Sequence, residues 1–143
     1  MAKILCDTDF IIKIANDPLP KVDWVSFSKQ NEIATIPLVV KELEGLKKSK
    51  EMQTVRRAKN ALAIIQEGKK IKVLSKEDDA KFHEADQELI ELTSASPDTV
   101  LATMDGSILS RLERMGLPYY TLSNNKLLEH PRKRATHLSL RKK

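Results

Sequence analysis

Four acidic residues of this chain interrupt or end apolar segments, which is an unfavourable place for a carboxylate. Asp7 and Asp105 each come at the end of a short apolar run. Glu42 and Asp86 each lie within an amphipathic pattern, on a helical wheel roughly 60° from the centre of the apolar stripe. A carboxylate carried toward a core is costly unless it is paired or bound to a metal ion. These four residues are therefore the candidate site of the chain.

The wheel positions depend on two predicted stripes. The first stripe contains Leu38, Val39, Val40, Leu43 and Leu46, and the second contains Phe82, Ala85, Leu89 and Leu92. On these wheels Glu42 lies on the side of the helix that faces the core, while Glu44 lies on the solvent-facing side with Lys48. Glu84, Glu88 and Glu91 point away from the second stripe. A glutamate at the edge of a stripe that simply reaches water is the ordinary alternative for Glu42.

Four carboxylates held together would repel one another strongly unless a cation neutralised them. Oxygen-only ligands select hard divalent ions, so the expected cofactor is one or two ions of Mg²⁺ or Mn²⁺. The single cysteine, Cys6, and the three histidines, His83, His130 and His137, form no set with zinc spacing. A metal that activates water would make a histidine base unnecessary.

The elements that must position these residues alternate along the chain. Strands are predicted at 3–7, 33–36, 71–74, 100–103 and 119–122, and helices near 10–16, 24–27, 37–47, 50–67, 75–94 and 108–116. Pro37 is placed for the first turn of a helix, Ser75 with Asp78 for a helix start, and Gly116 for a helix end. The alternation predicts an α/β fold: a three-layer sandwich with a central parallel sheet of about five strands flanked by helices. Ligands of such sheets bind outside the carboxyl ends of the strands, where Asp7 and Asp105 lie.

Charge is distributed unevenly along the 143 residues, which carry a net charge of +5. Residues 126–143 hold seven basic residues and one acidic residue, whereas the rest holds 18 basic and 19 acidic residues. A second basic cluster lies within 47–59. Such clusters attract phosphate backbones, so the candidate RNA-binding residues are Lys47, Lys48, Arg56, Arg57, Arg132, Lys133 and Arg134. The alternatives are a solvated helix face and a solubilising tail.

One domain, residues 1–128, and a basic, flexible tail, residues 129–143, are expected. With one cysteine, a disulfide framework within the chain is excluded, and Cys6 is expected to be a small buried hydrophobe in a strand. No signal peptide opens the chain, and no apolar run approaches the roughly 20 residues that cross a bilayer. We therefore expect a soluble, cytoplasmic protein with no membrane partner.

Four short motifs resemble those of the PIN-domain ribonuclease family. They are Asp7-Thr8-Asp9-Phe10-Ile11-Ile12, Pro37-Leu38-Val39-Val40-Lys41-Glu42-Leu43, Ala85-Asp86-Gln87-Glu88-Leu89-Ile90 and Ala102-Thr103-Met104-Asp105-Gly106. The resemblance spans about residues 3–128. Within the family it is similar to the archaeal and eukaryotic branch that includes nucleases of small-subunit ribosomal RNA processing.

The resemblance implies a metal-dependent endoribonuclease that hydrolyses RNA phosphodiester bonds, leaving 5′-phosphate and 3′-hydroxyl ends. Asp7, Glu42, Asp86 and Asp105 would be the catalytic residues and metal ligands. Thr8 and Thr103 would hydrogen-bond these carboxylates or the scissile phosphate. Asp9 departs from the uncharged residue of many relatives, and is either a helix cap, which we favour, or a fifth acidic group.

Several functions remain open at this level. The enzyme could mature ribosomal RNA, or be the toxin of a toxin–antitoxin pair. A chain of this family could also be a non-catalytic RNA-binding scaffold. The partners implied are RNA, such as a ribosomal RNA precursor, and either a second copy of the chain or an antitoxin-like protein.

Overall fold

A six-stranded sheet forms the centre of the computed structural model, which describes residues 2–17, 24, 26–66, 71–74, 84–123 and 126–131. Its strands are β1 (Lys3–Cys6), β2 (Glu32–Thr35), β3 (Lys72–Val73), β4 (Thr99–Ala102), β5 (Tyr119–Ser123) and β6 (Lys126–His130). They lie in the order β3-β2-β1-β4-β5-β6. The first five strands run parallel, and β6 is antiparallel to β5.

The central strand β1 is apolar because both of its faces are covered. Ile4, Leu5 and Cys6 are fully buried. Ile4 lies opposite Ile33 of β2 on one side and Val100 of β4 on the other. Strands buried on both faces are typically continuous apolar runs, and this explains why residues 3–6 show no alternation of polar and apolar residues.

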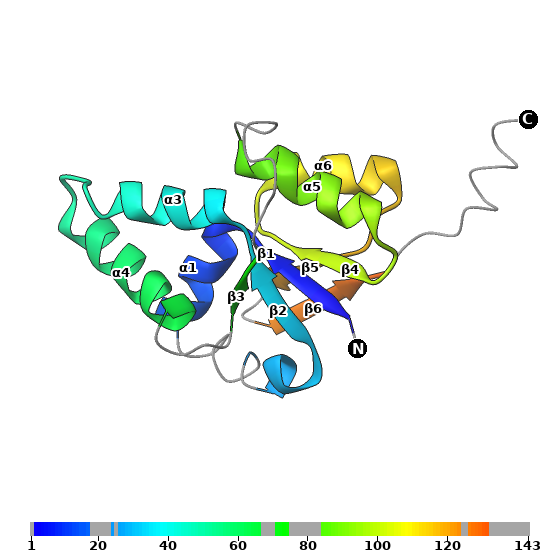
Figure 1. The fold of residues 1–143 in the computed structure, drawn as a ribbon, viewed down its shortest axis with the longest axis horizontal. Coiled ribbons are helices and arrows are strands. Elements are labelled where there is room, and N and C mark those ends of the chain that lie inside the picture. Colours follow the sequence, from blue (N-terminus) through cyan, green and yellow to red (C-terminus); the bar gives the residue numbers. More distant parts are fainter. Residues whose placement is uncertain are drawn as a thin grey trace, which may run out of the picture.

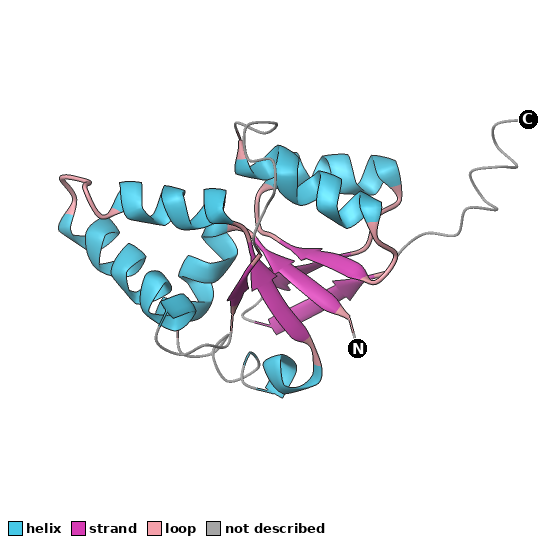
Figure 2. Cartoon of the chain, in the orientation of Figure 1, coloured by secondary structure: helices cyan, strands magenta, loops and turns pink. Residues whose placement is uncertain are grey.

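Helices cover the two faces of the sheet. The helices α1 (Thr8–Asn16), α3 (Pro37–Leu46) and α4 (Met52–Gln66) gather on one side, and α5 (Ala85–Ala95) and α6 (Gly106–Met115) lie on the other (Figures 1 and 2). A further short helix contains residues 26–30. The predicted three-layer α/β sandwich is therefore confirmed. None of the helices within the described ranges is long and apolar enough to span a membrane.

The residues predicted to begin one helix and to end another lie where the sequence predicts them. Pro37 occupies the first turn of α3, where its missing N–H costs nothing. Gly116 caps α6 with φ 69° and ψ 23°, a left-handed conformation that glycine adopts without a steric penalty. Its amide closes the helix through the carbonyl oxygens of Leu112 and Glu113.

Two elements differ from the prediction. The helix expected to run from Ser75 begins at Ala85, since Glu84, its N-cap residue, has an extended backbone. Ser75, Asp78 and Phe82 lie outside the described residues. The strand β6 was not predicted, because this edge strand shows no apolar alternation and is exposed along much of its length. Its backbone pairs with β5 in antiparallel register, and the ring of His130 stacks on Tyr119 at 4.4 Å between centroids. The sheet thus continues past residue 129, the expected start of the tail.

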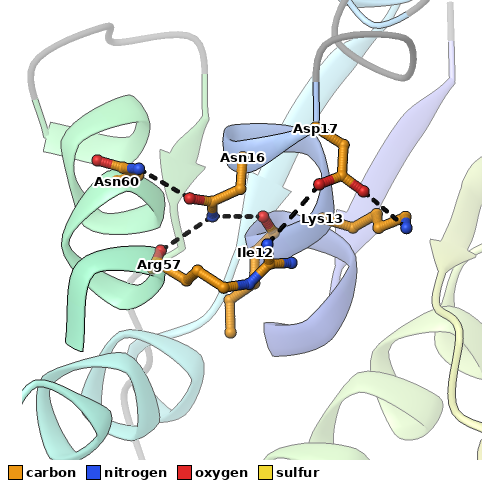
Figure 3. A network of polar contacts seen from close by, with 6 residues as sticks. All are labelled: Ile12, Lys13, Asn16, Asp17, Arg57 and Asn60. Carbon is orange, nitrogen blue, oxygen red and sulfur yellow. Dashed lines mark hydrogen bonds and ion pairs between the residues drawn. The ribbon is translucent and has the colours of Figure 1, made fainter. Parts of the chain in front are cut away.

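A polar network joins the end of α1 to α4 (Figure 3). The side-chain amide of Asn16 donates to the backbone carbonyl oxygen of Arg57 at 3.1 Å, and its oxygen accepts from Asn60 at 2.7 Å. Asp17 forms ion pairs with Lys13 at 2.6 Å and with Arg57 at 3.7 Å. The carboxyl end of α1 is therefore fixed to its neighbour, while its amino end remains at the edge of the sheet that carries Asp7.

Candidate acidic site

The strand order brings distant acidic residues to one edge of the sheet. From β1 the chain proceeds to β2 and β3 on one side, and later to β4 and β5 on the other. This reversal between β1 and β4 is the switch point at which open α/β sheets bind ligands. Asp7 directly follows β1, and Asp105 caps the helix that follows β4. The residues after both strands therefore lie side by side.

The two helical acids reach the same edge from opposite faces. The helix α3 leaves the carboxyl end of β2, so Glu42 lies within its second turn from that edge. The helix α5 leads toward the amino end of β4, so its own beginning, with Asp86, lies at the carboxyl edge. All four acidic residues line one cleft of about 380 Å³, together with Thr8, Asp9, Gly45 and Leu46.

Asp7 is the buried member of the group, with 4% of its surface exposed. One carboxylate oxygen accepts from the Phe10 amide at 2.9 Å, which makes Asp7 the N-cap of α1, and the other accepts from the Thr103 hydroxyl. Burial is the main reason that the pKa of Asp7 rises to about 7, and the charges of Asp9 and Asp86 add to it. The hydrogen bonds from Thr103 and Phe10 act in the opposite direction.

Asp105 performs the same local task for α6. Its carboxylate accepts from the amides of Ser107 at 2.8 Å and Ile108 at 3.2 Å. Its own amide donates to the Thr103 hydroxyl oxygen at 3.1 Å. Thr103, which is fully buried, thus contacts both aspartates and fixes their relative positions.

Glu42 lies on the cleft side of α3 and is exposed, so the expectation that it points toward the core is wrong. Val39 and Leu43 fill the core-facing positions of the helix. The Glu42 carboxylate accepts a hydrogen bond from the Thr8 hydroxyl. Glu44, which was expected on the solvent-facing side, is half-buried and pairs with Lys47 at 3.1 Å.

Asp86 is half-buried in the first turn of α5. Its pKa is raised, first by burial and then by the charges of Asp105 and Glu42, with smaller contributions from Glu84 and Asp9. The charges of Asp105 and Glu42 act on Asp86 because all three residues line the same cleft. The cleft therefore concentrates negative charge that the described residues lining it do not balance.

The architecture of this chain is also found among known protein structures. No family model and no curated protein matches the sequence. Among solved structures, the chain is similar to the PIN domain endonuclease Utp24, with a TM-score of 0.66 and 20% identity over 92% of each chain. The chain has the PIN-domain fold. At this identity the likeness concerns the fold, and the roles of individual residues in this PIN fold remain predictions.

The position of Asp9 in this PIN fold differs from the prediction. The N-cap of α1 is Asp7, so the favoured interpretation of Asp9 as the cap is wrong. Asp9 is exposed in the first turn and lines the cleft. Gly45 and Leu46 were also missed. Their positions three and four residues after Glu42, on the same side of a helix, were the available signal.

The burial of Glu88 differs from the prediction made for α5. It was expected to point away from the core, yet only 2% of its surface is exposed. The residues that α5 buries are Ala85, Glu88, Leu89, Ile90 and Thr93. The buried face of α5 is therefore wider than the predicted stripe, with Glu88 added on one side and Ile90 and Thr93 on the other. The elements packed around the helix, and not its apolar pattern alone, decide which side is covered.

The candidate RNA-binding residues fall into three groups. Lys47, Lys48 and Arg56 are exposed, although Lys47 also pairs with Glu44. Arg57 is half-buried and directed at Asp17 (Figure 3), which gives it a structural role. Arg132, Lys133 and Arg134 lie outside the described residues.

The donors of the cleft suit a hard divalent cation, since they are carboxylate and hydroxyl oxygens. In the described conformation, no three acidic, histidine or cysteine side chains among the described residues are already arranged to hold one ion. The hydroxyls of Thr8 and Thr103 engage two of the carboxylates instead. The residues thus fit an ion in kind and location, and binding would require side-chain rotation.

Proposed function

We propose that this chain is a divalent-cation-dependent endoribonuclease that hydrolyses RNA phosphodiester bonds. One observation carries the proposal: Asp7, Glu42, Asp86 and Asp105, from four separate elements, line one cleft at the switch point of a PIN fold. Asp7 and Asp105 each cap a helix, but capping does not require four carboxylates in one cleft, where they repel one another. Their repulsion is relieved if they jointly bind Mg²⁺ or Mn²⁺.

A bound divalent ion would lower the pKa of a water ligand and neutralise charge on the phosphate undergoing attack. The residues of the chain hold the ligands in place for this chemistry. Thr103 fixes Asp7 against the end of β4, and two backbone amides of α6 fix Asp105. Glu42 is exposed and, among the residues that the structure describes, is held by Thr8 alone, so of the four it can turn most readily toward an ion.

RNA reaches the acidic cleft only if other charges offset its repulsion. Gly45 and Leu46 line the cleft, and the exposed Lys47 and Lys48 follow them directly in the chain. These lysines, with Arg56 of α4, can contact phosphates outside the acidic centre. Such contacts position RNA without reading its sequence. Maturation of a ribosomal RNA precursor is the biological role that the sequence motifs favour.

Cleavage of a labelled single-stranded RNA, with Mg²⁺ or Mn²⁺ and with EDTA, tests the proposal. We expect cutting that requires the ion and leaves 5′-phosphate ends. Asp7→Asn should reduce the rate by at least about 100-fold, the upper end of what is lost when an outer-sphere partner is removed. Asp98→Asn is the matched control, since Asp98 is exposed in the turn before β4 and does not line the cleft.

Failure would take two recognisable forms. A wild-type chain that binds RNA but leaves it intact with either ion would instead support a non-catalytic scaffold. An Asp7→Asn variant as active as the wild type would show that the cutting activity resides elsewhere or in a contaminant.

A further inference from the structure

A second cleft adjoins the acidic one. Its volume is about 410 Å³, and it lies between α3 and the beginning of α5. Its lining consists of Leu38, Lys41, Glu42, Glu84, Ala85 and Asp86. Glu42 and Asp86 also line the acidic cleft, so the two hollows meet at these carboxylates. A chain-like ligand with one unit at the acidic cleft would place its next unit here.

Lys41 gives this second cleft a chemistry that the first one lacks. Among the described residues that line either cleft, it is the one with a cationic side chain. Lys41 is exposed and forms no ion pair with any residue that the structure describes, whereas Lys47, the C-cap of the same helix, pairs with Glu44. No ion pair within the described part of the chain therefore neutralises its charge.

The remaining surface of the second cleft is partly apolar. Leu38 precedes Lys41 by three residues, so both lie on one side of α3, and the buried Ala85 faces them from α5. A volume of this size falls within the roughly 300–1,000 Å³ of pockets that hold small ligands. One cation beside an apolar wall suits a nucleotide, which combines an anionic phosphate with flat, weakly polar faces.

The balance of charge favours the same occupant. Glu42, Glu84 and Asp86 would exclude a phosphate from this cleft if nothing offset them. When Glu42 and Asp86 are engaged with the ion of the proposed site, Glu84 is the remaining acidic group of the lining. Lys41 then offsets Glu84, and the cleft becomes able to accept an anion.

We propose that the second cleft binds the nucleotide next to the scissile phosphate, and that Lys41 pairs with the phosphate of that nucleotide. This inference rests on the proposed ribonuclease function and names a substrate-binding subsite of the same site. Lys41 acts here as a substrate-binding residue, without a part in the attack on phosphorus.

Steady-state cleavage of single-stranded RNA by Lys41→Ala, Lys41→Arg and Lys29→Ala variants tests the subsite. Lys29 is the matched control because it is exposed, and it precedes the amino end of β2, at the edge of the sheet opposite the site. For Lys41→Ala we expect KM to rise by about fivefold, as for loss of one charge contact, with kcat within about twofold. The salt dependence of binding should lose about one phosphate contact.

Lys41→Arg should restore KM, since it keeps the charge. The increase in melting temperature on adding Mn²⁺ should be the same in Lys41→Ala and wild type, which excludes damage to the fold or the acidic site. An unchanged KM in Lys41→Ala, or a reduced kcat at unchanged KM, would overturn the inference while leaving the ribonuclease function standing. If the wild type cuts no RNA, the function fails separately. RNA-binding anisotropy, with and without Lys41→Ala, then decides the subsite, and equal affinities would refute it.

Discussion

At the scale of single residues, Asp7 combines two demands that conflict. As the N-cap of α1 its negative charge is favourable, because it accepts an amide hydrogen bond and complements the helix dipole. Its burial next to Asp9 and Asp86 is unfavourable to that same charge and raises its pKa to about 7. A carboxylate kept in such a place destabilises the ion-free protein, and a bound cation would relieve this cost.

The raised pKa of Asp7 predicts how stability depends on pH. An unfolded aspartate has a pKa of 3.8, so between pH 4 and about 7 the folded chain binds more protons than the unfolded chain. Stability from this group is therefore lost as pH rises through that window, by up to about 1.4 kcal/mol per pH unit. In EDTA, we expect Asp7→Asn to melt at a higher temperature than wild type at pH 8, and the difference to disappear near pH 4.

Asp17 provides a control of opposite sign. The hydrogen bond and charge of Lys13, with the charge of Arg57, hold the pKa of Asp17 below its ordinary value. Its contribution is therefore present at neutral pH and is lost as pH falls. Asp17→Asn should lower the melting temperature at pH 8, by the small amount typical of a partly exposed ion pair. For Asp7, the opposite trend would contradict the raised pKa: a wild-type protein that becomes more stable, relative to Asp7→Asn, as pH rises from 5 to 7.

At the scale of elements, the sequence predicted what short-range rules control. The apolar run 3–6, Pro37 and Gly116 each determine local structure through their own covalent geometry or solvation, and β1, α3 and the end of α6 lie where expected. The edge strand β6 was missed because its stability comes from pairing with β5 and from the Tyr119–His130 stack, which no local pattern encodes.

The candidate site shows the same division. The rule that ligands bind at the carboxyl ends of parallel strands was enough to select Asp7 and Asp105, since each follows an apolar run. Helical wheels selected Glu42 and Asp86 but misjudged the exposure of Glu42 and the burial of Glu88. A wheel assumes one apolar face, whereas the actual buried face of each helix depends on which neighbours pack on it.

The polar network between α1 and α4 yields a stability prediction. Asn16 donates to the carbonyl oxygens of Ile12 at 2.7 Å and Arg57 at 3.1 Å, and accepts from Asn60 at 2.7 Å. Asn16→Ala removes all of these bonds in a half-buried position. We expect a loss of about 1–2 kcal/mol in the free energy of unfolding, measured by urea denaturation.

Asn60→Ala is the matched comparison for Asn16→Ala, because Asn60 is exposed and, within the described residues, its side chain is bonded to Asn16 alone. It should cost less than about 1 kcal/mol. Equal effects of the two variants would mean that the bonds of Asn16 to the backbone contribute nothing to the attachment of α1 to α4.

At the scale of the whole molecule, charge of both signs is segregated. The acidic cleft lies at the switch point of the sheet, and the exposed Lys47 and Lys48 follow the end of α3, while the exposed Arg56 lies in α4; Figure 1 shows these two helices. For a ligand with a repeating negative charge, this arrangement makes the surroundings attractive and the centre repulsive until a cation is bound. Binding and cleavage should therefore respond differently to salt and to divalent ions.

Replacing Lys47, Lys48 and Arg56 together by alanine tests the basic surroundings. Each lost phosphate contact reduces the slope of log affinity against log salt by about 0.7 for a single strand, so the triple variant should lose about 2. Anisotropy titrations of labelled RNA at several salt concentrations measure this slope, with Lys29→Ala as the control. A slope unchanged in the triple variant would place the RNA on another surface.

The position of β1 between β2 and β4 has a consequence for how the site moves. The Asp7 amide donates to the carbonyl oxygen of Ala102 at 3.1 Å and so extends the hydrogen bonding of the innermost strand. Local opening events in proteins start from weakly bonded segments, and the innermost strand opens only with the whole domain. Asp7 is thus a fixed position in the site, and adjustment around an ion would come from side chains such as the exposed Glu42 turning toward it.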